Sequence, residues 1–354
     1  MNKKLLSTIL AVLMLLFVAC DSNDDDNNPV GPDESYDFTS IINSYVNKTI
    51  IPTYAQFKGA ATEMEANIDK LIASKTQANV DAACKSWKDA RIGWEASEAF
   101  LFGPAADFNI DPSLDSWPLD FGELNKVINS NEEITKDMLL ENKGPAIRGF
   151  HTAEYLLFRD GAPRKVADIT ERELQYLKVT TGIIKDDVES LYKSWTTSYN
   201  VEFINAGKAG SRFASQEAAI DQLINGVITI ADEVGTGKLV DPFEAKNPLL
   251  VESWYSWNSL IDFQYNIRGI ENAYMGGFDK SDRGTGLDKF IEAKNPTLNA
   301  RVKAEITDAI NKIGAIPAPF RSNLDKDTEI NAAINACLKV RDTFQKDILP
   351  LVVK

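Results

Sequence analysis

The only histidine of this 354-residue sequence, His151, stands three residues before Glu154 in a largely apolar segment. On a helix, residues three apart are neighbours, so the imidazole and the carboxylate can bind one cation together or form a hydrogen bond with each other. Both would share a helical stripe with Ile147 and Phe158, where an unpaired polar group is costly. The pair therefore predicts a cation site, and a purely structural His–Glu hydrogen bond is the alternative.

Further carboxylates lie upstream, where Arg91, Glu95 and Glu98 follow one another at helical spacing. Glu98 continues the helix face of Trp94 and is expected to point toward the site. Glu95 is a second candidate ligand, with an ordinary helix-surface pair to Arg91 as the alternative. Asp120 follows a Trp-Pro turn and is either a ligand or the cap of the next helix.

A single histidine restricts the metal chemistry that one chain can offer. Catalytic zinc sites of the thermolysin type, the two-histidine iron triad and the standard di-iron helical bundle all need at least two histidines. Cys84 and Cys337 cannot complete a Cys/His zinc cluster, and they form either a disulfide or two buried thiols. One imidazole with several carboxylates suits iron, manganese or calcium better than catalytic zinc.

The N-terminus has the pattern of an exported protein. Lys3 and Lys4 precede an uncharged apolar run, residues 9–19, that is too short to span a bilayer and ends at Cys20. This resembles a bacterial lipobox and predicts a signal peptide at residues 1–19 and acylation of Cys20, with an ordinary signal peptide as the alternative. Residues 20–38 are then a flexible acidic tether.

The predicted chain is therefore exported and lipid-anchored to the bacterial cell envelope, on the outer membrane. Its formal net charge of −14 disfavours nucleic acid and anionic membrane surfaces as partners, so membrane contact is expected through the lipid anchor only.

Apolar residues after Thr39 recur mostly at helical spacing, which predicts an all-α fold. Helices are expected near residues 39–74, 77–102, 145–158, 170–198, 215–234, 248–275, 296–312 and 327–347. These fit two helical bundle domains, residues 39–205 and 206–354. The segment from Ile147 to Tyr155 is similar in sequence to the segment from Ile267 to Tyr274. The similarity predicts an internal duplication in which both segments occupy equivalent helices, and a chance match is the alternative.

Three segments resemble those of imelysin-like proteins: Gly149–Phe158 with its Gly-x-His-x-x-Glu pattern, Trp87–Pro104, and Trp117–Asp120. The resemblance implies two duplicated bundles with the histidine motif near their interface, and Gly149, Arg148 and Arg91 as supporting residues. Arg148 would orient a carboxylate or contact an anion, or simply lie solvated on the surface.

Some members of that family are classed as metallopeptidases, whereas others are linked to bacterial iron uptake. The predicted function is an envelope lipoprotein that binds iron, or an iron-bearing ligand, together with other envelope uptake proteins. A metallopeptidase and a helical partner-binding scaffold are the alternatives. No catalytic residue is predicted, and the question of enzymatic activity stays open.

Overall fold

The regular secondary structure of the computed structural model, which describes residues 36–353, is almost entirely helical. The predicted signal peptide, Cys20 and most of the tether lie outside these residues. The described strands are two residues long each and pair as one antiparallel hairpin. The all-α fold class is therefore confirmed. No helix within residues 36–353 combines the length and the apolar character that a membrane crossing requires.

The elements up to residue 204 are α1 (Thr39–Ser44), η1 (Tyr45–Ile50), α2 (Ile51–Ala73), α3 (Gln77–Ser97), η2 (Glu98–Phe100), α4 (Pro104–Asp107), α5 (Ile110–Asp115), α6 (Phe121–Ile128), α7 (Lys136–Glu141), η3 (Pro145–Ile147), α8 (Gly149–Leu157), β1 (Phe158–Arg159), β2 (Ala162–Pro163), η4 (Val166–Asp168), α9 (Glu171–Thr197) and α10 (Tyr199–Ile204). After residue 215 follow α11 (Gln216–Asp232), η5 (Glu233–Val240), α12 (Asp241–Ala245), η6 (Pro248–Leu250), α13 (Ser259–Met275), α14 (Leu287–Lys294), α15 (Pro296–Ala315), η7 (Phe320–Ser322), α16 (Asp327–Thr343), η8 (Phe344–Ile348) and α17 (Leu349–Val352).

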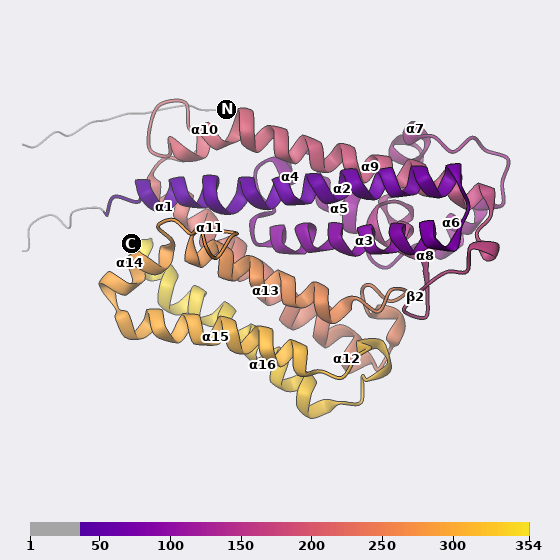
Figure 1. The fold of residues 1–354 in the computed structure, drawn as a ribbon. Helices are drawn as coiled ribbons and strands as arrows, with labels where there is room; N and C mark the ends of the chain where they lie inside the picture. Colours follow the sequence, from indigo (N-terminus) through magenta and orange to yellow (C-terminus); the bar gives the residue numbers. More distant parts are fainter. Residues whose placement is uncertain (1–35, 354) are drawn as a thin grey trace, which may run out of the picture. The chain divides into compact units, whose positions relative to one another are not determined.

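Two groups of long helices pack against each other within the unit that begins at residue 37. In the first group α2 packs on α3 and α9, with α8 between α3 and α9 (Figure 1). In the second group α15 packs on α13 and α16, and α11 contacts α16 and α13. Helix α3 also packs on α13, and one hydrophobic core runs through both groups. The domain boundary at residues 205 and 206 stays a prediction.

Side-chain caps set the starts of several of these helices. Thr170 accepts a hydrogen bond from the backbone N–H of Glu173, whose carboxylate accepts one from the Thr170 backbone, so a complete capping box begins α9. Thr76 and Ser215 cap α3 and α11 through their hydroxyl oxygens. Such caps satisfy N–H groups that have no partner within the helix.

Three π-helices, η1, η5 and η8, occur in residues 36–353, and each ends two residues before a proline. Proline has no N–H to offer the carbonyl four residues earlier, and its ring crowds that carbonyl. In all three cases the residue four positions before the proline is a lysine: Lys48 before Pro52, Lys238 before Pro242, and Lys346 before Pro350. The carbonyl of Lys48 is satisfied instead by the backbone N–H of Phe278, at 2.7 Å.

Several expectations from the sequence were wrong in detail. The predicted helix 248–275 begins only at residue 259, because a 3₁₀ turn and then turns occupy residues 248–257. Residues 104–141 contain four short helices that the periodicity did not indicate. The segment that starts at Ile147 leads into α8, whereas the one that starts at Ile267 lies inside α13. The internal duplication is not confirmed.

Candidate functional site

The approach of α5 to α8 depends on Gly149, the first residue of α8. Its φ is +78°, and a Cβ atom there would lie 2.3 Å from the carbonyl oxygen of Leu114. Its backbone N–H donates to Thr180 Oγ1 at 2.9 Å. Because only glycine fits this contact, Asp115 can come within 3.0 Å of His151, measured from Oδ1 to Nε2.

His151 is held from its other side by Glu154. Nδ1 of the imidazole lies 3.2 Å from Glu154 Oε2. The second oxygen, Oε1, accepts hydrogen bonds from the backbone N–H and the hydroxyl of Ser256, both at 2.7 Å. Both oxygens of Glu154 therefore have protein partners, whereas Nε2 of His151 has no aligned hydrogen bond within the described residues.

A fully buried guanidinium, that of Arg91, lies at the centre of the acidic cluster. It contacts Glu95 one helical turn along α3 and Asp115 at the end of α5. It also reaches Glu252 at 2.6 Å and Asp262 at 3.5 Å. One cation thus joins carboxylates of α3, of the end of α5, of the turns before α13 and of α13 itself.

A second buried cation, Lys238 of η5, faces the same cluster. Its Nζ lies 3.1 Å from Glu98, 3.2 Å from Glu252, 3.6 Å from Glu95 and 3.9 Å from Glu233. Only 6 % of this side chain is exposed. Glu252, which lies in the turns before α13, contacts both buried cations.

Neutral donors fix the orientation of these carboxylates. Trp94 Nε1 donates to Asp115 Oδ2 at 2.6 Å. The amide nitrogen of Asn266 donates to Glu95 at 2.6 Å and to Glu98 at 2.9 Å. These bonds leave each carboxylate with a defined direction, which a preformed ligand set requires.

Four residues of the cluster, Glu98, Asp115, Lys238 and Glu252, line an open cavity of about 600 Å³. The cavity is lined by Glu98, Asp111, Asp115, Trp117, Pro118, Glu233, Gly237, Lys238, Asp241, Glu244, Ala245, Leu250 and Glu252. Asp115 and Glu252 of this lining, together with the buried His151, each offer a ligand atom, and these atoms lie within 4.8 Å of one another. The donor set fits a hard cation, since it combines one imidazole nitrogen with carboxylate oxygens.

The acidic groups of the cluster differ in the direction in which their pKa values are shifted. Burial alone would raise the pKa of Asp115, but Arg91 and His151 hold it well below its usual range. Burial alone would lower the pKa of His151, but the neighbouring Asp115 and Glu154 raise it to about 9. Asp115 and His151 therefore form a charged pair in the metal-free protein.

For the remaining carboxyl groups, the nearby cations do not offset the effect of burial on the pKa. Burial raises the pKa of Glu95 to about 8 and that of Asp262 to about 6, although Arg91 opposes both shifts. Burial also raises the pKa of Glu98 well above its usual range, against the influence of Lys238. The cluster contains more carboxyl groups than its own cations neutralise, so it is short of positive charge.

The structure brings His151, Glu154, Glu95, Glu98 and Arg91 together but leaves two predicted residues elsewhere. Asp120 is exposed and caps α6 by accepting from the backbone N–H of Glu123. Arg148 is buried rather than solvated, and its guanidinium donates to the Leu139 carbonyl at 2.8 Å. It supports the short helices beside the site.

Sequence reasoning missed four residues of the cluster: Asp115, Lys238, Glu252 and Asp262. Asp115 lies two residues before the Trp-Pro turn and so left a local signal, whereas the lysine–proline spacing of Lys238 does not distinguish it from Lys48 and Lys346. Glu252 and Asp262 left none. Cys84 and Cys337 are buried free thiols, with pKa values raised by burial to about 12.

The fold and the site together define an all-helical protein with a buried histidine–carboxylate cluster beneath an acidic cavity. The sequence pattern of the family described as imelysin matches residues 50–346, and the chain belongs to this family. It is 27 % identical over 319 residues to iron-regulated protein A of Synechococcus elongatus, covering 88 % of this chain and 86 % of that protein.

Two solved structures share the fold. One is a protein described as an iron-regulated protein A precursor from Parabacteroides distasonis, with a TM-score of 0.82, 33 % identity, and coverage of 90 % of this chain and 95 % of the other. The second is an imelysin-like protein from Psychrobacter arcticum, with a TM-score of 0.72, 13 % identity, and coverage of 88 % and 94 %. The second likeness concerns the fold alone.

Proposed function

We propose that this chain binds iron, or a small iron-bearing ligand, in the acidic cavity as part of uptake at the bacterial cell envelope. The observation that carries this proposal is the set of Asp115, His151 and Glu252, whose ligand atoms lie within 4.8 Å of one another, and Asp115 and Glu252 line the open cavity. The iron-regulated relative supports the choice of metal, because its name links it to iron.

In this proposal His151 binds the metal through Nε2, and Glu154 keeps it in place. A histidine ligand commonly donates its other ring N–H to a carboxylate, which fixes the tautomer and the ring direction. Glu154 accepts from Nδ1 at 3.2 Å and has no oxygen left without a partner. It is thus a positioning residue in this proposal, whereas Asp115 and Glu252 supply oxygen ligands.

Calorimetric titration of metal-free protein with Fe²⁺, Mn²⁺, Ca²⁺ and Zn²⁺ tests the proposal. We expect a saturable Fe²⁺ site that is lost in His151→Ala and whose affinity falls about 10- to 100-fold in Glu154→Gln, as for other residues that orient a ligand. Asp120→Asn is the matched control, because it removes an exposed charge and keeps a good helix cap. No saturable binding, or equal binding by His151→Ala, would reject the proposal.

The same samples decide between binding and catalysis. Peptide cleavage that depends on both the metal and His151 would turn the proposal toward a metallopeptidase. The anchoring part is tested separately by metabolic labelling with a fatty acid, which should tag the native chain but not Cys20→Ala.

A further inference from the structure

The ammonium group of Lys238 occupies the position of a bound cation. It lies within 3.3 Å of carboxylate oxygens on both Glu98 and Glu252, and both of these residues line the cavity. Glu95 lies slightly farther, at 3.6 Å. Ammonium groups and hard metal ions seek the same oxygen ligands, so the surroundings of Lys238 are those of a cation site.

This burial is specific to one of three similar lysines. Lys48 and Lys346 stand at the same spacing before a proline, but each is substantially exposed and forms an ion pair with a single aspartate. The proline and the π-helix therefore do not by themselves bury a lysine. The carboxylates around η5 account for the different position of Lys238.

A further oxygen is present without a partner. Asn266 is fully buried, and its amide nitrogen donates to Glu95 and Glu98. Its Oδ1 has no hydrogen-bond partner within the described residues. A half-turn of this amide would replace the two hydrogen bonds that Nδ2 donates by an oxygen that faces Glu95 and Glu98, and amide oxygens are common neutral ligands of hard cations.

We propose that Lys238 is a tethered cation holding a second metal site, made by Glu95, Glu98 and Glu252, and that it withdraws when a divalent ion binds there. Exchange of one positive charge for two would ease the shortage of positive charge in the cluster. The cavity gives the displaced side chain room, because Lys238 and Gly237 both line it. The second site uses no atom of His151, so it goes beyond the proposed function, although Glu252 is shared.

Lys238→Met tests this exchange with Mn²⁺ as the probe. The variant loses the competing charge, so we expect its Kd for Mn²⁺ to fall about tenfold or more. Its melting temperature should be lower than that of the native chain in a chelator and should recover on addition of Mn²⁺. Glu98→Gln in the same chain should abolish the recovery, and Lys48→Met alone should show none of these effects.

The variant His151→Ala with Lys238→Met separates this proposal from the function proposed above. One Mn²⁺ equivalent bound by this double variant supports the second site even if His151 proves to have no role in the native chain. Mn²⁺ binding by Lys238→Met that is no tighter than native binding, without recovery of the melting temperature, would overturn the proposal.

A measurement on the native chain covers the case in which Lys238→Met does not fold. Lysine acylation followed by mass spectrometry should show Lys238 protected in a chelator and labelled several-fold faster with saturating Mn²⁺. Labelling of Lys48 serves as the internal reference. An unchanged labelling rate of Lys238 would contradict its withdrawal.

Discussion

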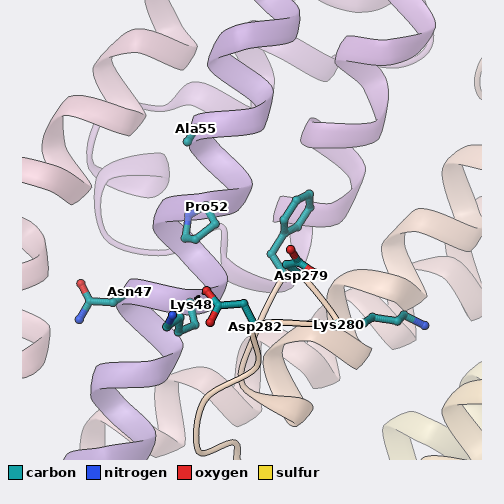
Figure 2. A pocket seen from close by; sticks show the side chains of 8 residues that line it. Asn47, Lys48, Pro52, Ala55, Asp279, Lys280 and Asp282 are labelled. Atoms are coloured by element: carbon teal, nitrogen blue, oxygen red, sulfur yellow. Dashed lines mark hydrogen bonds and ion pairs between the residues drawn. The ribbon is translucent and has the colours of Figure 1, made fainter.

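Among the cavities that lie beside π-helices in residues 36–353, one beside η5 and one beside η1 have similar volumes, and only the first has the features of a site. The acidic cavity beside η5 measures about 600 Å³. A pocket beside η1, shown in Figure 2, measures about 660 Å³ and is lined by Asn47, Lys48, Pro52, Ala55, Phe278, Asp279, Lys280 and Asp282. Each is lined by a lysine that stands four residues before a proline.

The charges differ between the two cavities. In the pocket beside η1, Lys48 meets Asp282 at 2.6 Å (Figure 2). Lys280 pairs with Glu271 at 2.9 Å. Each lysine there has its own carboxylate, and 41 % of the Lys48 side chain is exposed. Lys238 in the acidic cavity is shared among four carboxylates. Volume alone therefore does not mark the site, whereas an excess of buried carboxylates does.

The largest loss of unfolding free energy is expected when the buried guanidinium of Arg91 is removed. Arg91→Met would leave Glu95, Asp115 and Glu252 without their common partner, and breaking a buried ion pair costs about 3–5 kcal/mol. Urea unfolding of the metal-free variant should show a loss of this size in the free energy of unfolding. A loss below about 1 kcal/mol would mean that the acidic cavity is no more dependent on its cations than the pocket beside η1.

A smaller loss is expected at the glycine contact beside the acidic cavity. Gly149→Ala would place a Cβ atom 2.3 Å from the Leu114 carbonyl in a residue with φ of +78°. We expect a cost of about 1–3 kcal/mol, together with weaker metal binding, because Asp115 would move away from His151. Gly59→Ala is the control, since nothing lies within 4 Å of its added Cβ, and it should not destabilise α2. An unchanged metal affinity in Gly149→Ala would show that this contact does not position the metal ligands.

A moderate pH dependence should distinguish the two cavities. His151 has its pKa raised from 6.5 to about 9, so its stabilising charge is present below pH 6.5 and is lost as the pH rises to about 9. Glu95 has its pKa raised from 4.5 to about 8, so between these pH values the folded form keeps a proton that the unfolded form has released. The folded form therefore loses stability as the pH rises across that range. The free energy of unfolding of the metal-free protein should therefore fall as the pH rises, by at most about 1.4 kcal/mol per pH unit for each proton.

Denaturant titrations across this range would measure the slope. His151→Gln should flatten the slope between pH 6.5 and 9, and Glu95→Gln should flatten it between pH 4.5 and 8. A slope that neither variant alters would show that other groups set the pH dependence.

The smallest effect is expected in the pocket beside η1. Lys48→Met removes an exposed pair with Asp282, and exposed ion pairs contribute about 0.2–1 kcal/mol. Its free energy of unfolding should stay within about 1 kcal/mol of the native value, and its metal affinity should not change. A loss of unfolding free energy as large as that of Arg91→Met would mean that the two cavities do not differ in how strongly they depend on their cations.

The sequence predicted the long helices well because their apolar periodicity and caps are local properties. The short helices between residues 104 and 141 were missed, since four to eight residues are too few to show a period. The helix predicted from residue 248 was too long by eleven residues at its start. Apolar and aromatic residues in the preceding turns, including Val251 and Trp254, imitate a helical pattern and pack on the core without forming one.

The sequence predicted only those site residues whose spacing along one helix is visible in the sequence. His151, Glu154 and the acidic residues of α3 carry their spacing in the sequence. Asp115, Glu252 and Asp262 reach Arg91 through tertiary packing, which no spacing records. Glu154 illustrates the difference between proximity and role, because its partner Ser256 lies 102 residues away and occupies the oxygen that a metal would need.

The central position of α3 has a consequence for cooperativity. Cβ atoms added at Gly269 and Gly226 would lie 2.5 Å and 2.3 Å from the carbonyl oxygens of Ala96 and Ala99, so α13 and α11 approach the end of α3 and η2 at backbone distance. Helix α3 also packs along α2 in the first group. Neither group of helices can open without exposing a surface of this one segment. We therefore expect the amide protons of α3 to exchange with solvent only through global unfolding, and both groups to melt in one transition.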